Sequence, residues 1–146
     1  MNISISNEVR SVAPNLCLGC VSGRVNVEKN NEALWHIIDS HIRQLSFTMT
    51  LESLVNSPQI SVMREAYKNL GKDPSRYRGS AEALLRRILS GKGMYKINTV
   101  VDINNLVSLK TFHSVGSYDL ERLTEPLGAA PLARMSKRRN WSSEGS

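Results

Sequence analysis

The sequence predicts a single domain in which amphipathic helices follow a strand-like N-terminal segment. Three observations support this prediction. A chain of 146 residues is long enough to bury a core within one domain. Charged residues make up 22% of the chain and hydrophobic residues 40%, which is typical of a soluble domain and excludes a disordered one. Apolar residues also recur at helical spacing in several separate runs.

The sequence gives no sign of membrane insertion or secretion. No stretch approaches the roughly 18 apolar residues that a membrane span needs. The N-terminus, MNISISNEVRSVAP, has no basic flank followed by an apolar run. We therefore expect a cytoplasmic protein with no membrane partner.

The first expected element is a strand over residues 15–27, which contains Cys17 and Cys20 in a C-x-x-C spacing. Such a spacing is also found in redox motifs and in half of a zinc site. Residues three apart in a strand point to opposite faces, so the two sulfur atoms would not meet. We therefore expect two small, buried or half-buried thiols, no metal site and no cofactor.

Two amphipathic helices are predicted next. Apolar residues at helical spacing indicate a helix over residues 30–45. The tripeptide Asn-Ser-Pro at 56–58 breaks the chain before a second helix over residues 59–70. Gly71 is a natural C-terminal cap for that second helix.

Two further helices are expected in the second half of the chain. The first covers residues 80–89, with Ser80 as its N-cap and Glu82 in its positive first turn. The second covers residues 99–109 and is apolar on nearly every side. Such a helix is expected to be buried, so Asn104 and Asn105 would need partners inside the fold.

The remaining segments are less regular. Residues 114–120 read as a turn that leads to a strand or a short helix. After Leu127 the chain is rich in small and basic residues without periodicity. We therefore expect a folded domain over residues 1–127 and a basic, disordered tail over 128–146.

The positive charge is concentrated in one band of the sequence. Residues 61–96 contain nine basic and three acidic residues, so this band alone accounts for the net charge of +6. Such a band suits the phosphates of a nucleic acid. The alternative is that these cations are the solvated faces of two helices. The candidate phosphate-binding residues are Arg64, Lys68, Lys72, Arg76, Arg78, Arg86 and Arg87.

Several runs, taken in order, resemble one family. They are REAYKNLGKDPSRYRGSAEALLRRILSGKG, KINTVVDINNLVSL and GSYDL. Over residues 11–127 the chain resembles the editing and tRNA-binding domain of phenylalanyl-tRNA synthetase beta subunits, in a free-standing form. The resemblance implies an α+β fold with helices packed on a mainly antiparallel sheet. It also implies tRNA as a partner, with mischarged aminoacyl-tRNA as the substrate.

The resemblance implies part of a catalytic site. In the synthetase the domain hydrolyses tyrosine wrongly attached to the phenylalanine tRNA, which requires stabilisation of an oxyanion and a pocket that sorts side chains. The family's pocket-lining pair falls on Asn104 and Asn105. Its editing histidine falls on Gly116, with His113 nearby but out of register, and its glutamate lies beyond the end of this chain. We therefore expect an incomplete domain whose candidate catalytic residues are Asn104, Asn105 and His113.

Three functions are weighed at this point. One is an RNA-directed module, either a trans-editing deacylase or its tRNA-binding remnant. The second is a protein-interaction scaffold that has lost its chemistry, consistent with Gly116. A DNA-binding regulator is disfavoured because the helix over residues 99–109 has almost no side chains that could read bases.

Overall fold

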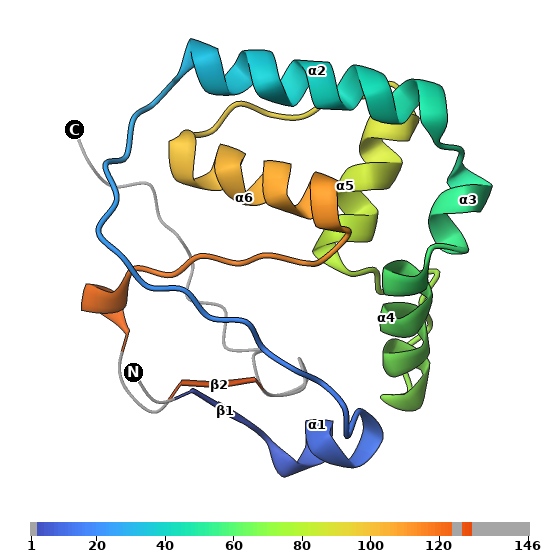
Figure 1. The fold of residues 1–146 in the computed structure, drawn as a ribbon. Coiled ribbons are helices and arrows are strands. Elements are labelled where there is room, and N and C mark those ends of the chain that lie inside the picture. Colours follow the sequence, from blue (N-terminus) through green and yellow to red (C-terminus); the bar gives the residue numbers. More distant parts are fainter. Residues whose placement is uncertain (1–2, 124–126, 130–146) are drawn as a thin grey trace.

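The protein is mostly helical (Figure 1). The computed structural model describes residues 3–123 and 127–129. In chain order the elements are β1 (Ile3–Ile5), α1 (Asn7–Val12), α2 (Glu32–Thr48), α3 (Leu51–Val55), α4 (Pro58–Asn69), α5 (Ser80–Leu89), α6 (Thr99–Thr111), the 3-10 helix η1 (Leu120–Arg122) and β2 (Leu127–Ala129). The four longest helices confirm the helices expected from periodicity.

Side chains at the helix starts explain where several helices begin. Asn31 accepts a hydrogen bond from the Leu34 amide at 3.0 Å and caps α2. Asn98 caps α6 in the same way through the amide of Val101. Both residues satisfy a backbone N–H group that has no partner inside its helix. Gly71 follows α4 with a φ of +70°, which confirms its predicted capping role.

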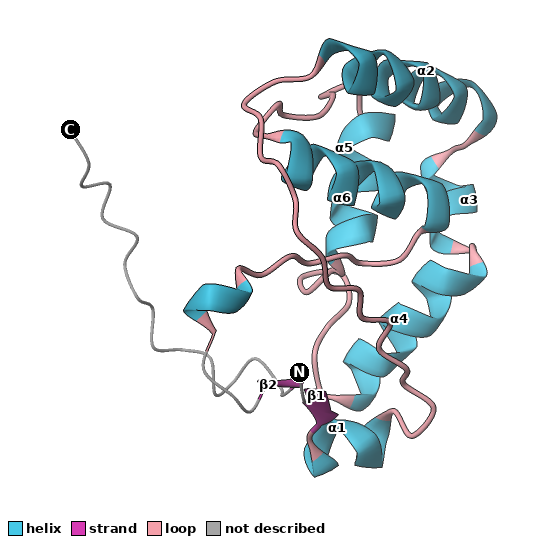
Figure 2. Ribbon diagram, turned by 60° about the vertical axis from the view of Figure 1, so that its left-hand side comes forward, coloured by secondary structure: helices cyan, strands magenta, loops and turns pink. Residues whose placement is uncertain are grey.

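The core lies where α5 packs against α2, α3 and α6. These helices gather at one end of the molecule, while β1, β2 and α1 lie at the other (Figure 2). Burying one aliphatic side chain in this core stabilises the folded state by about 1.5 to 3 kcal/mol. The core residues are Leu45, Leu54, Ile60, Leu85, Ile88 and Leu109.

The predicted α+β fold with a mainly antiparallel sheet is wrong. Within residues 3–123 and 127–129, the strand pairing is a two-stranded parallel ladder that places Ile3 opposite Leu127. The expected strand over 15–27 does not form: Asn15 lies in a turn, and residues 16–27 have no regular secondary structure. Apolar surface is buried by packing helix on helix instead.

The exposure of the two cysteines also differs from the prediction, because the expected sheet does not form over them. Cys17 and Cys20 are both exposed, so the expectation of buried or half-buried thiols is wrong. Val21 beside them is 99% exposed. No sheet forms over this segment in the described part of the chain, and its side chains therefore stay in contact with solvent.

Two helix details also depart from expectation. Ser80 is the first residue of α5 and not its N-cap, a position that Gly79 occupies. The hydroxyl of Ser114 accepts from the amide of Ala81 at 3.3 Å, so a residue distant in sequence supplies a hydrogen bond to the start of α5. Full burial of α6 is also wrong, since Ile103 and Val107 are exposed.

The last expected segments fall partly within the described residues. Residues 113–119 have no regular secondary structure and lead into the short helix η1, which is one of the two expected outcomes for this region. Of the expected tail, Gly128 and Ala129 belong to β2, and residues 130–146 lie outside the described residues.

Candidate nucleic-acid interface

A buried carboxylate organises the centre of the basic band. Glu82 lies in the first turn of α5, and its side chain is only 2% exposed. Arg64 of α4 donates from Nη1 to Glu82 Oε1 at 2.8 Å, and Arg86 donates from Nε to the same oxygen at 2.8 Å. A buried carboxylate is costly unless it is paired, and these charge-assisted hydrogen bonds offset that cost.

A third arginine approaches the same oxygen without forming a hydrogen bond. Arg78 Nε lies 3.9 Å from Glu82 Oε1, and the Arg78 side chain is 40% exposed. The side chains of Arg64 and Arg86 are 23% and 27% exposed. Three guanidinium groups therefore surround one carboxylate. Because Asp73 also lies near Arg64 and Arg78, the local excess is one positive charge. Arg78 is the most exposed of the three.

The loop over residues 70–79 adds cations beside this cluster. Asp73 orders the loop by accepting from the Ser75 amide and the Ser75 hydroxyl, both at 2.8 Å. These two hydrogen bonds, the backbone one first, lower the pKa of Asp73, and the charges of Arg64 and Arg78 lower it further. Arg64 also donates to the carbonyl of Pro74 at 3.4 Å, which ties α4 to the loop.

The other predicted cations have different surroundings. Lys68 and Arg76 are exposed, on α4 and in the loop respectively. The ammonium group of Lys72 lies 5.1 Å from the ring centre of Tyr77. Arg87 instead donates to the carbonyls of Gly93 and Lys92 and stacks on Tyr95 at 4.1 Å, so it holds the connection between α5 and α6.

We call six of the predicted cations the basic surface: Arg64, Lys68, Lys72, Arg76, Arg78 and Arg86. They come from α4, the loop 70–79 and α5, and Glu82 joins three of them directly. The sequence prediction counted Glu82 only as a helix-dipole residue and missed its pairing role. Its spacing of four residues from Arg86 was the signal that could have revealed half of this cluster.

A second buried carboxylate, also missed from sequence, joins α2 to α6. Asp102 is 1% exposed and accepts from the indole N–H of Trp35 at 2.8 Å and from the amide of Ile97 at 3.2 Å. Lys96 lies over the face of the Trp35 ring, 4.6 Å from its centre. The acidic residue inside an otherwise apolar helical run was the available signal.

Of the candidate catalytic residues, Asn104 and Asn105 lie in the middle of α6, and His113 lies just after its C-terminal end. Asn104 is half-buried and donates from its side-chain amide to the Ser117 hydroxyl at 2.8 Å. Asn105 is half-buried, and His113 is exposed in the segment after α6. The side chain of Asn104 thus fixes the extended segment that follows the helix.

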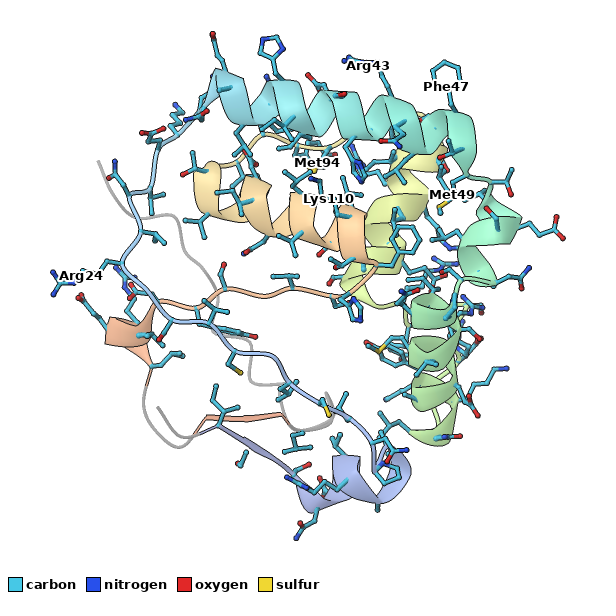
Figure 3. The ribbon with its side chains drawn as sticks, viewed as in Figure 1. Arg24, Arg43, Phe47, Met49, Met94 and Lys110 are labelled. Carbon is cyan, nitrogen blue, oxygen red and sulfur yellow. The ribbon has the colours of Figure 1, made fainter. Side chains whose placement is uncertain are left out.

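An open groove of about 400 Å³ lies between α2 and α6 and contains none of the predicted site residues. The side chain of Lys110 and the neighbouring Met94 lie on the side of α2 that faces α6, whereas Arg43 and Phe47 point away from α6 (Figure 3). Within the described residues, no three His, Cys, Asp or Glu side chains gather as a metal site. The groove is lined by His36, Ile37, Ser40, His41, Gln44 and Lys110.

No helix among the described residues is both long and apolar enough to cross a bilayer. In a comparison with known protein families, residues 62–140 match the family model of the B3/4 domain. Neither curated proteins nor solved structures match this chain. The matched range covers more than half of the 146 residues and contains the whole basic surface. The chain therefore belongs to the B3/4 domain family, the domain found in the beta subunit of phenylalanyl-tRNA synthetase.

Proposed function

We propose that this protein binds tRNA through the basic surface, and that mischarged aminoacyl-tRNA is its physiological partner. The observation that carries the proposal is the arrangement at Glu82. Three arginines meet at one buried carboxylate, and with Asp73 near two of them the group still carries one positive charge in excess. Family membership supports RNA as the polyanion.

Within the basic surface, the cations divide into two roles. Arg64 and Arg86 are held at 2.8 Å from Glu82 and position the surface. Arg78 lies farther from the carboxylate and is more exposed, so its planar guanidinium group is available for two parallel hydrogen bonds to a phosphate. Lys68 and Arg76 are exposed and lie close to Arg78 in the sequence. Their charges add to the attraction for the phosphate backbone of the tRNA.

We assign this binding to the domain proposed over residues 1–127 and place it in the cytoplasm. In this arrangement Asn104 and Asn105 lie towards the aminoacylated end of the tRNA. Hydrolysis would require water to attack the ester carbonyl while hydrogen-bond donors stabilise the developing oxyanion. The side-chain amide of Asn104 is a donor of the right kind, although it is held by Ser117 in the free protein.

The alternative is a tRNA-binding protein without hydrolytic activity. By the family resemblance, residue 116 corresponds to the editing histidine of the synthetase domain, and the glycine found there favours this alternative. His113 is exposed and has its backbone amide directed to Thr111 Oγ1 at 3.3 Å. The two candidates share the basic surface and differ only in the chemistry at α6.

Binding is tested with labelled tRNA and the substitution Arg78→Ala. Arg43→Ala is the matched control, because Arg43 is an equally charged, exposed residue on the outer side of α2 (Figure 3). We expect Arg78→Ala to weaken tRNA binding several-fold and Arg43→Ala to leave it nearly unchanged. Equal weakening by both variants would show that binding depends on the net charge of the protein and not on the basic surface. That result, or no tRNA binding by the wild type, would overturn the proposal.

Hydrolysis is tested separately with tyrosine attached to the phenylalanine tRNA. An editing deacylase releases tyrosine faster than buffer does, and Asn104→Ala lowers that rate while tRNA binding persists. A protein that binds the tRNA and does not release tyrosine is the non-hydrolytic alternative. The two outcomes are therefore distinguished by one substrate.

A further inference from the structure

An exposed tyrosine lies in the connection between α5 and α6. The guanidinium group of Arg87 lies over the ring of Tyr95, 4.1 Å from the ring centre. A guanidinium group over an aromatic face makes an attractive cation–π contact. Tyr95 is nevertheless 65% exposed. With one face of the ring covered by Arg87, this exposure means that the opposite face is open to solvent.

The arginine behind the ring is itself held in place. Arg87 donates from Nε to the carbonyl of Gly93 at 2.9 Å and from Nη2 to the carbonyl of Lys92 at 3.1 Å. Gly91 and Gly93 have φ angles of +73° and +61°, which residues with side chains rarely adopt, so the chain can turn back towards Arg87. The ring of Tyr95 is therefore supported before any ligand binds, and such preorganisation lowers the entropy lost on binding.

The surroundings of this ring favour a ligand with phosphate groups. Residues 87–98 contain three cations and no acidic residue. Lys92 and Lys96 are exposed and lie on either side of Tyr95 in the sequence. Proteins bind single-stranded nucleic acid by stacking its bases on aromatic rings while neighbouring cations attract its phosphates. Bases in a duplex are already stacked on one another, so an unpaired nucleotide is the ligand that this ring suits.

This contact lies outside the basic surface. Arg78 precedes α5 and Tyr95 follows it, and the ten residues of α5 span about 15 Å. We propose that Tyr95 stacks on an unpaired nucleotide of the bound tRNA, while the basic surface contacts phosphates. The inference rests on the proposed tRNA binding and adds to it a preference for unpaired RNA. Because every base has a flat face, this preference depends little on which base is unpaired.

The preference is tested with two RNA hairpins of equal chain length, one with an unpaired single-stranded extension and one that ends in a blunt duplex. We expect the full-length wild type to bind the extended hairpin about tenfold more tightly, which is within the range that stacking of one base provides. Tyr95→Ala should remove this difference, whereas Tyr95→Phe should keep it because the aromatic ring remains. The fluorescence of 2-aminopurine in the extension should fall on binding to the wild type and to Tyr95→Phe, but not on binding to Tyr95→Ala.

Phe47→Ala is the matched control, because Phe47 is an exposed aromatic residue that points away from α6 (Figure 3). It should keep the preference of the wild type, and Arg78→Ala should weaken binding of both hairpins by the same factor. Since the ring of Tyr95 is exposed, Tyr95→Ala should keep its helical circular dichroism, and that measurement separates loss of the contact from loss of the fold.

The outcomes distinguish this inference from the proposed function. Equal affinity of the wild type for the two hairpins would overturn the inference and leave tRNA binding intact. A preference that survives in Tyr95→Ala, or one that is lost in Phe47→Ala as well, would also overturn it. No binding of either hairpin by the wild type would overturn the proposed function together with the inference.

Discussion

Arg86 and Arg78 lie eight residues apart and approach the same carboxylate oxygen, yet their surroundings differ. Arg86 donates to Glu82 at 2.8 Å and is mostly covered, whereas Arg78 lies at 3.9 Å and is 40% exposed. The first arginine satisfies a buried charge within the fold. The second adds positive potential at the surface.

This contrast separates stability from binding within one group of cations. Removing a cation held close to a buried carboxylate leaves that carboxylate less compensated. Removing an exposed cation changes mainly the surface potential, since exposed ion pairs contribute little to stability. Substitutions at Glu82, Arg86 and Arg78, followed by the titration of Asp73, therefore form a graded series of tests.

The largest expected effect is that of Glu82→Gln. The substitution keeps the shape of the side chain and leaves Arg64, Arg78 and Arg86 around a neutral group. Because two charge-assisted hydrogen bonds are weakened and three cations repel one another, we expect the free energy of unfolding to fall by about 2 to 3 kcal/mol. Urea unfolding followed by circular dichroism measures this loss. An unchanged unfolding midpoint would show that Glu82 does not organise the cluster.

A smaller effect is expected for Arg86→Ala, which removes one of the two short hydrogen bonds to Glu82. We expect a loss of about 1 to 2 kcal/mol in the free energy of unfolding. Arg78→Ala is the matched comparison, and we expect it to change the same quantity by less than about 0.5 kcal/mol. Equal losses in the two variants would contradict the division of roles.

The smallest effect concerns the pH dependence of the loop 70–79. The pKa of Asp73 lies below its ordinary value of 3.8 because the Ser75 amide and hydroxyl donate to the carboxylate. A lowered folded-state pKa means that Asp73 contributes stability above about pH 3.8 and loses it as the pH falls through the folded-state value. A carbon-detected NMR titration should show the low pKa. Ser75→Ala should raise it only part of the way, because the backbone hydrogen bond remains.

The helices were predictable from sequence because helical periodicity is local. The spacing of apolar residues was sufficient to locate α2, α4, α5 and α6. The strand expected over 15–27 failed because a strand needs a partner elsewhere in the chain, and local pattern does not identify one. The antiparallel sheet followed from family resemblance alone, and the described residues form no such sheet.

The candidate site was predictable in composition but not in its internal contacts. The cations of the basic surface were all identified from the charge of residues 61–96. Their division into two roles depends on the pairing of Arg64 with Glu82, which joins residues 18 apart on different helices. No local spacing rule predicts that contact, because it depends on how α4 packs beside α5.

The most direct test of the account is the salt dependence of tRNA binding. Each lost phosphate contact should reduce the slope of log affinity against log salt by about 0.7 to 0.9. For the triple substitution of Lys68, Arg76 and Arg78 by Ala, we predict a slope that is shallower by about 2 to 3 than that of the wild type and of Arg43→Ala. Identical slopes for all three proteins would contradict tRNA binding through the basic surface.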